Sequence, residues 1–285
     1  MPTDAETRRV QNARNLSAAR ERYPGQWVKM LDEWKNSTTG NRAWMIYAAN
    51  YLLSSKGYKW AVDPYVLSTR VKGMVEPDFQ NDLSPLSLVV LTHKHKDHLD
   101  TRLITALKHA NIQWVIPEDV LEKLTELDIV PGGQVTIPVH GQPLPFGPLT
   151  LTPFDSLHIH GFRGVPETGY LLECDGCRWL FPGDIRAHDF SRLPAFGRLN
   201  GVFAHLWMGK ARALDEEPPF FHSFCEFFTS FDTSRLVITH LNEFGRDETE
   251  LWTESHYEKA RSWISQQKPG LVVKKAMMGD RVDLD

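Results

Sequence analysis

The side chains of this sequence that could do chemistry are concentrated in one segment, Thr92-His93-Lys94-His95-Lys96-Asp97-His98-Leu99-Asp100. Side chains of an extended chain alternate between two faces, so His93, His95 and Asp97 can point the same way. If Asp100 caps a following helix, the turn into that helix can bring His98 beside Asp97. Imidazoles combined with a carboxylate suit zinc or iron better than magnesium or calcium. The segment therefore predicts a metal site.

A solvated charged loop is the alternative interpretation, because two lysines lie between the histidines. The metal site is favoured because the segment directly follows Leu86 to Thr92, a nearly continuous apolar run. Such runs are typical of strands that are buried on both faces. In layered α/β proteins, binding sites form at the ends of these strands.

Three more candidate ligands, His158, Asp184 and His240, also lie at the ends of predicted strands. His160 is an alternative to His158, because residues two apart on a strand share a face. Each of these residues taken singly is typical of a hydrogen-bonded structural residue, but their order after the histidine segment favours metal ligation. For the spare histidines near the motifs, His160, His188 and His205, we expect structural roles.

In this order the residues resemble the pattern of the metallo-β-lactamase superfamily: His-x-His-x-Asp-His, then a lone His, an Asp after a Gly, and a final His. The resemblance spans residues 43 to 285. Asp-His-Leu-Asp100 and Trp60-Ala-Val-Asp-Pro64 are similar to the branch that contains ascorbate-phosphate lactonase and N-acylphosphatidylethanolamine phospholipase D. The segment from Ala276 to Leu284 resembles the closing strand of that branch.

The resemblance implies a two-metal hydrolase. One metal ion would be held by His93, His95 and His158, and the second by Asp97, His98 and His240, with Asp184 bridging the two. Asp63 would orient a ligand histidine through its other ring nitrogen. The implied cofactors are two divalent ions per chain, with Zn²⁺ favoured and Mn²⁺ or Fe²⁺ as alternatives.

This metal pair would clamp one water and lower its pKa, which supplies a bridging hydroxide at neutral pH. The hydroxide would attack the phosphorus or carbonyl carbon of a phosphodiester, phosphoester or lactone. Asp97 and Asp184 are the expected catalytic residues, since they ligate the metals and help to orient the nucleophile. The residue that donates a proton to the leaving group is not assigned.

The elements that must position these residues follow from hydrophobic patterning. Trp27, Met30, Leu31 and Trp34 form one face of a helix, which Pro24-Gly25 is expected to separate from an earlier helix. Two strands are expected from Ala43 to Leu53 and from Tyr58 to Val62, and a long polar loop from Ser68 to Ser84. Later strands and helices alternate, and Asp175-Gly176 predicts a hairpin turn between Cys174 and Cys177.

Runs of strands followed by helices, twice over, indicate an α/β (α+β) fold with two stacked sheets and helices outside, a four-layer αββα sandwich. Layering alone leaves other folds open, and the resemblance selects the metallo-β-lactamase-like one. We expect an N-terminal helical extension over residues 1–42 that packs on a hydrolase domain of residues 43–285.

Composition limits the remaining classes. The 285 residues carry a formal net charge of −4 and three cysteines, so neither a basic nucleic-acid-binding surface nor a disulfide scaffold is indicated. A nucleic-acid substrate is therefore disfavoured and a small-molecule substrate expected. No apolar stretch reaches the length of a membrane span. Because the first residues lack the apolar core of a signal peptide, we expect a cytoplasmic protein. A homo-oligomer is left open.

Two other functions compete with the hydrolase. A single-iron oxidoreductase of the dioxygenase type would keep the same histidines, whereas a flavodiiron-type site would have a Glu where His95 stands. A non-catalytic metal-binding sensor is the third hypothesis. Metal content and turnover discriminate among the three.

Overall fold

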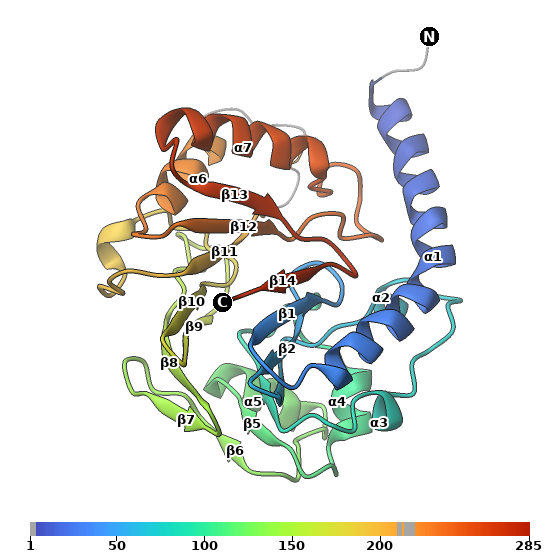
Figure 1. Ribbon diagram of the computed structural model, residues 1–285. Coiled ribbons are helices and arrows are strands. Elements are labelled where there is room, and N and C mark those ends of the chain that lie inside the picture. The colour runs from blue at the N-terminus through green and yellow to red at the C-terminus, as the bar shows by residue number, and fades with distance from the viewer. Residues whose placement is uncertain (1–3, 210–212, 214–219) are drawn as a thin grey trace.

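The computed structural model describes residues 4–209, 213 and 220–285, which form two facing sheets (Figure 1). The first seven-stranded sheet has the order β14-β1-β2-β3-β4-β5-β6 and the second the order β13-β12-β11-β10-β9-β8-β7. The strands of the first sheet are β1 (Asn41–Met45), β2 (Tyr51–Ser55), β3 (Tyr58–Val62), β4 (Leu88–Val90), β5 (Gln113–Val115), β6 (Val135–Thr136) and β14 (Arg281–Asp283). Those of the second are β7 (Leu144–Phe146), β8 (Leu149–Asp155), β9 (Thr168–Cys174), β10 (Cys177–Phe181), β11 (Gly201–His205), β12 (Arg235–Thr239) and β13 (Val272–Lys275).

Helices cover the outer face of each sheet (Figure 1). On the side of the first sheet are α1 (Asp4–Asn36), α2 (Leu67–Arg70), α3 (Phe79–Asp82), α4 (Thr101–Leu107) and α5 (Glu118–Glu126). On the side of the second are α6 (Phe220–Thr229), α7 (Glu254–Gln267) and the short 3-10 helix η1 (Phe190–Arg192). This arrangement confirms the predicted four-layer αββα sandwich.

The alternation of side chains along the strands builds three apolar layers. In β2, Leu53 joins the layer between the sheets, while its neighbour Leu52 packs beneath the outer helices. In β10, Trp179 faces the layer between the sheets and Leu180 faces the outer helices of the second sheet. Strands buried on both faces in this way read as continuous apolar runs in the sequence.

Parallel pairing brings the ends of the motif-bearing strands together. In the first sheet β3, β4, β5 and β6 are parallel, so the chain leaves β3 and β4 at the same edge. In the second sheet β10, β11 and β12 are parallel as well. The segments after β3 and β4 therefore meet those after β10, β11 and β12 at one end of the sandwich.

The predicted break in the N-terminal helix is wrong, because α1 runs from Asp4 to Asn36 with Pro24 inside it. The buried face does not end at the proline: Ala19 and Tyr23 before it and Trp27 after it are all buried in the same outer layer. Continuous packing outweighs the loss of one hydrogen bond that a proline causes.

Two predictions about the strands also need correction. The single strand expected from Ala43 to Leu53 is a hairpin of β1 and β2, whose connection is closed by the bond from the Ile46 N–H to the Asn50 carbonyl at 2.8 Å. Every residue of this turn is buried, so hydropathy gave no sign of it. The loop expected from Ser68 to Ser84 contains most of α2 and all of α3, and β7 and β11 were not predicted.

Local signals of turns and caps were more reliable. Asp100 is the N-cap of α4, and its carboxylate accepts hydrogen bonds from the Arg102 and Leu103 N–H groups. Asp175 and Gly176 have φ of 52° and 75°, as a tight hairpin turn requires, and Cys174 pairs with Cys177 across it.

No helix of the described residues combines the length and apolarity that crossing a bilayer demands.

Trp34 provides a test of how strongly α1 is attached. Its side chain is fully buried, and its Nε1 donates a hydrogen bond of 2.8 Å to the Leu53 carbonyl of β2. Trp34→Ala should lower the free energy of unfolding by about 3–5 kcal/mol, as truncation of a buried aromatic residue does. Val28→Ala, on the same helix and 66% exposed, is the matched control. Urea denaturation measures both, and equal midpoints would contradict this packing role.

Candidate metal centre

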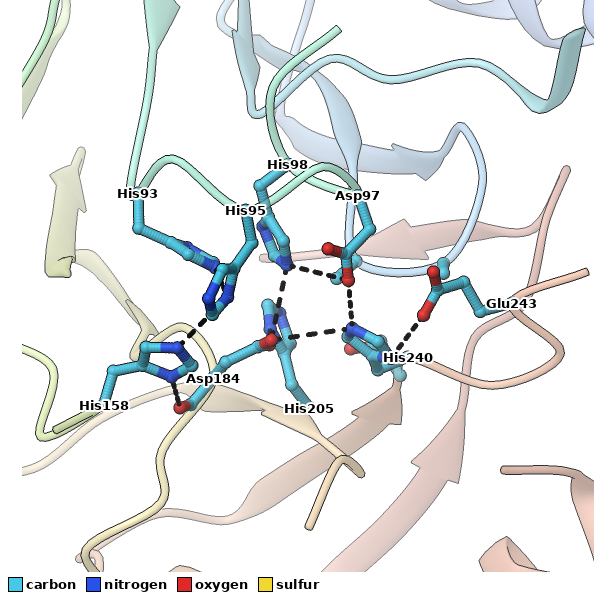
Figure 2. A network of polar contacts seen from close by, with 12 residues as sticks. His93, His95, Asp97, His98, His158, Asp184, His205, His240 and Glu243 are labelled. Atoms are coloured by element: carbon cyan, nitrogen blue, oxygen red, sulfur yellow. Dashed lines mark hydrogen bonds and ion pairs between the residues drawn. The ribbon is translucent and has the colours of Figure 1, made fainter. Parts of the chain in front are cut away.

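Nitrogen and carboxylate oxygen atoms converge in two groups at the end of the sandwich where the strands meet. One group is His93, His95 and His158; the other is Asp97, His98, Asp184 and His240. Within each group the potential ligand atoms all lie within 4.8 Å of one another. Figure 2 shows these side chains pointing toward one another from separate loops. The seven residues expected to ligate metals are thus brought together.

The histidine segment reaches this arrangement by turning rather than by remaining extended. β4 ends at Val90, and the N–H groups of His98 and Leu99 both donate to the His95 carbonyl at 3.0 Å. This turn directs His93 and His95 into one group and Asp97 and His98 into the other. The expected placement of His98 beside Asp97 is observed, but the strand-like alternation is not.

Beyond β8 the chain separates the two histidines that sequence reasoning placed on one face. β8 ends at Asp155, and Leu157 has a φ of 62°, a left-handed conformation that redirects the backbone. His158 is buried within the ligand group, whereas His160 is exposed and pairs through its backbone with Arg163. His160 lies at the rim of the adjoining pocket and outside both groups.

Three of the ligand-group histidines have an oxygen acceptor close to one ring nitrogen. Nδ1 of His93 lies 2.9 Å from Glu167 Oε1, and Nδ1 of His98 lies 2.8 Å from Asp63 Oδ2. Nδ1 of His158 hydrogen-bonds to the Asp184 carbonyl. Nδ1 of His240 is 3.8 Å from Glu243, too far for a hydrogen bond, and has no hydrogen-bond partner among the described residues. An acceptor at Nδ1 favours a proton there and leaves Nε2 as a lone-pair donor, which is how proteins orient metal-binding histidines.

The structure places Asp63 next to His98. Its carboxylate accepts from the Thr92 N–H at 2.8 Å and from the Thr92 hydroxyl, in addition to its contact with His98. The Asn50 amide donates to the carbonyls of both Asp63 and Asp97 at 2.9 Å. The loops after β3 and β4 are thereby fixed to each other.

Glu167 is a residue of the site that sequence reasoning missed. It is buried directly before β9, and it accepts hydrogen bonds from the Ser156 hydroxyl at 2.6 Å and from the Asp184 N–H at 3.0 Å. Its other contacts are with the Nδ1 atoms of His93 and His158. Gly183 lies so close that an added Cβ would come within 2.3 Å of Glu167 Oε1, and its φ is 78°. The Pro-Gly-Asp184 motif was a signal for this close approach.

We expected a structural role for His205, and in the structure its side chain contacts Asp184. Its Nδ1 lies 2.9 Å from Asp184 Oδ1, and its Nε2 lies 2.8 Å from the Tyr51 hydroxyl. His205 is the last residue of β11, a strand that was not predicted, so its place beside Asp184 could not be anticipated. His188 contacts the Ser223 hydroxyl through Nδ1 at 2.7 Å, outside both ligand groups.

The electrostatics of the two groups differ. Burial lowers the pKa of His93 to about 3 and that of His95 and His158 to about 4, so these imidazoles are neutral and can donate lone pairs. Burial opposes the ionisation of Asp97 and Asp184, but hydrogen bonds and the charges of His98 and His240 outweigh it and hold both carboxyl pKa values well below normal. Burial opposes the protonation of His98 and His240, but the neighbouring carboxylates outweigh it and raise both imidazole pKa values. The second group therefore favours a positive charge among its atoms, carried by these protons or by a metal ion in their place.

The unpartnered atoms of the second group test whether a metal ion fits it. His98 Nε2 and His240 Nε2 are buried without a hydrogen-bond partner among the residues described. They lie 3.5 and 3.7 Å from Asp184 Oδ2, and His240 Nε2 lies 3.5 Å from Asp97 Oδ2. Tetrahedral ligands at zinc bond lengths are separated by about 3.3 Å. The spacing and the donor types fit a divalent transition metal.

The sequence and fold of the chain are similar to those of known proteins. A family model described as a beta-lactamase superfamily domain matches residues 63–241, which include every candidate ligand. The chain belongs to the metallo-β-lactamase superfamily. No curated protein matches the sequence at a significant level.

Several solved structures share this fold at low sequence identity. The metallo-β-lactamase fold protein YhfI of Bacillus subtilis has a TM-score of 0.61 and 16% identity over 85% of this chain and 98% of its own. Igni18, a metallo hydrolase of Ignicoccus hospitalis, has a TM-score of 0.58 and 18% identity, over 85% and 97%. CmlA, a diiron β-hydroxylase of Streptomyces venezuelae, has a TM-score of 0.59 and 16% identity over 86% of this chain, which spans only 54% of CmlA. Proteins that share this fold thus include a metallo hydrolase and a diiron β-hydroxylase.

Glu167 allows a test of how the ligands are oriented. Glu167→Gln keeps the shape but removes the charge that holds Nδ1 of His93, so metal affinity should fall by about 10- to 100-fold. Competition with a chromogenic chelator measures this affinity. Glu173→Gln, on β9 but paired with the surface residue Arg178, is the control and should bind metal like the parent chain. Equal metal affinities in the two variants would contradict a role of Glu167 in orienting the metal ligands.

Proposed function

We propose that this protein is a hydrolase that uses two divalent metal ions, zinc in preference to Mn²⁺ or Fe²⁺, to cleave a phosphodiester, phosphoester or lactone. The observation that carries the proposal is the convergence of two neighbouring groups of potential ligand atoms, all from buried residues except the partly buried His95, at one end of the sandwich. In this proposal His93, His95 and His158 hold one ion. Asp97, His98 and His240 hold the other, and Asp184 lies between them.

The position of Asp184 supports a bridging role. Its Oδ2 faces the imidazoles of the second group, while its carbonyl accepts from His158 of the first. Its Oδ1 is held by His205, so the carboxylate cannot rotate freely between the groups. Asp184 thus lies next to both groups: its carboxylate Oδ2 faces the second, and its backbone carbonyl orients a histidine of the first.

The chemistry of the site is then divided between metals and protein. Bound metal ions would lower the pKa of a water and polarise the substrate oxygen. Asp97, whose Oδ2 accepts from Arg246 at 2.8 Å, keeps a fixed orientation from which it can accept a hydrogen bond from that water. The pocket of about 810 Å³ beside Asp97 and Asp184 has the size of a small-molecule site. We therefore propose a small-molecule substrate.

Within the superfamily we propose the branch of ascorbate-phosphate lactonase and N-acylphosphatidylethanolamine phospholipase D. The support is the Asp63-Pro64 pair directly after β3 and the Asp100 cap of α4. We also propose that residues 43–285 are the hydrolase domain and that residues 1–42 are an extension that packs on it.

Elemental analysis of protein purified without chelators or affinity metals tests the proposal first. We expect about two zinc ions per chain, followed by turnover of bis(p-nitrophenyl) phosphate or of simple lactones. One iron per chain with oxygen uptake would instead support the oxidoreductase. The diiron hydroxylase CmlA shares the fold of this chain. Bound metal without turnover on a wide ester panel would support the sensor.

His95→Ala should reduce ester turnover by more than the roughly 100-fold typical of residues that only orient a ligand, because it removes a ligand itself. It should also lower metal content without unfolding the chain, because His95 is only partly buried. His160→Ala is the matched control for metal content, which should not change. Normal turnover in His95→Ala would exclude the proposed site.

Asp184→Asn should shift the stoichiometry from about two metal ions per chain toward about one, because a neutral amide is a poor bridge between cations. Inductively coupled plasma analysis of the purified variant gives the ratio directly. Asp189→Asn, at the exposed cap of η1, should retain both ions. Unchanged stoichiometry in Asp184→Asn would rule out the bridging role.

A further inference from the structure

The pocket beside the ligand groups is lined by an excess of cationic side chains. Five of its lining residues are basic: Arg70, Lys96, Arg163, Arg186 and Arg246. Its carboxylates are Asp97 and Asp184 of the ligand groups and Glu250. The whole chain has a net charge of −4, so the pocket lining has the opposite sign of charge to the chain as a whole.

Two of the five cations are neutralised within the protein. Arg70 pairs with Glu243 at 3.2 Å. Arg246 contacts Glu243, pairs with Asp97 at 2.8 Å and with Glu250 at 3.2 Å, and stacks over the Trp207 ring. These two arginines therefore serve the ligand groups and have little charge to offer a substrate.

The other three cations have no such partner. Across residues 4–209, 213 and 220–285, no ion pair joins Lys96, Arg163 or Arg186 to a carboxylate. The Nε of Arg186 is buried and finds no acceptor among the described residues, and Nε2 of the neighbouring pocket residue His188 has no hydrogen-bond partner there either. A buried N–H group without an acceptor is costly, and for a guanidinium the matching acceptor is a phosphate or carboxylate.

The backbone holds two of these cations close to the ligand groups. Arg186 follows Asp184 by two residues, and its N–H donates to the Leu157 carbonyl at 3.2 Å. Arg163 is joined to His160 by two backbone hydrogen bonds, in the loop that follows His158. Both arginines are therefore attached to the same loops as proposed metal ligands, at the opening of the pocket.

We propose that Arg163, Arg186 and Lys96 bind an oxyanion of the substrate that is distinct from the group cleaved at the metals. The substrate class is a small ester or lactone that carries a phosphate or carboxylate at its other end. The inference rests on the proposed function for the location of the cleaved bond. The three cations gather in one pocket rather than along a stripe, which favours a small dianionic molecule over a polymer backbone.

Binding of noncleavable analogues tests the subsite on the metal-loaded protein. Propylphosphonate and propane-1,3-bisphosphonate differ only in the second phosphonate, and 4-phosphonobutanoate replaces that group by a carboxylate. Titration calorimetry should show the bisphosphonate binding at least about tenfold more tightly than propylphosphonate, as charge-assisted hydrogen bonds to arginine allow. Comparison with 4-phosphonobutanoate shows whether the subsite prefers phosphate or carboxylate.

Arg186→Met and Arg163→Met should each reduce this affinity ratio toward one and leave the affinity for propylphosphonate unchanged. Arg163 is exposed, so its variant should fold even if Arg186→Met does not. Arg261→Met removes an exposed arginine that pairs with Glu258 on α7, and it should leave the ratio unaltered. A ratio near one in the parent protein, or a ratio unchanged in both pocket variants, would overturn the proposal.

The same preference should appear in turnover. Among p-nitrophenyl phosphodiesters whose second ester group is propyl, 2-carboxyethyl or 2-phosphoethyl, the anionic members should have at least about tenfold higher kcat/KM, mainly through KM. If the metal-loaded protein turns over no member of the ester panel, the proposed function fails. The ratio of the two phosphonate affinities on that metal-loaded protein still tests the arginine subsite.

Discussion

The burial of five carboxylates around one end of the sandwich is the constraint on which the rest of the site depends. Asp63, Asp97, Glu167, Asp184 and Glu243 are each no more than 6% exposed. Buried carboxylates are stable only when hydrogen bonds or positive charges compensate them. Here imidazoles, backbone N–H groups and arginines do so. The same contacts orient His93 and His98 through their Nδ1 atoms.

Backbone conformation at the site reflects this constraint. Asp63, Leu157 and His240 have φ of 42°, 62° and 63°, in a region that residues other than glycine rarely adopt. Each lies in the segment that leaves β3, β8 or β12: Asp63 and His240 belong to the site, and Leu157 directly precedes His158. Such strain persists only where surrounding contacts over-determine it, and it concentrates at functional sites. At His240 the bond from its N–H to the Ala48 carbonyl at 2.8 Å, across to the first sheet, is one such contact.

The sequence predicted the layers and the candidate ligands because both leave local signals. A histidine segment after an apolar run, a Pro-Gly-Asp turn and single polar residues at strand ends are visible without knowledge of tertiary contacts. Glu167 and Tyr51 left no such signal, because a buried Glu or Tyr looks like any other until its partners are known. The break expected at Pro24 failed for a related reason: local propensity favoured a helix end, whereas packing over the first sheet kept α1 continuous.

The arginines at the site show how one residue type can serve two purposes in the same pocket. Arg246 is enclosed by Asp97, Glu243 and Glu250, and burial raises the pKa of Glu243 to about 7 despite this neighbour. The charge of Arg246 is thus neutralised by ion pairs within the protein, and the residue holds Asp97 in place. Arg186 lies on the opposite loop, beyond Asp184, and lacks any carboxylate partner in the described part of the chain. Arg246, which is ion-paired, orients a proposed metal ligand, whereas Arg186, which is not, is available to bind the substrate. The charge that selects a substrate therefore need not disturb the charges that would hold the metals.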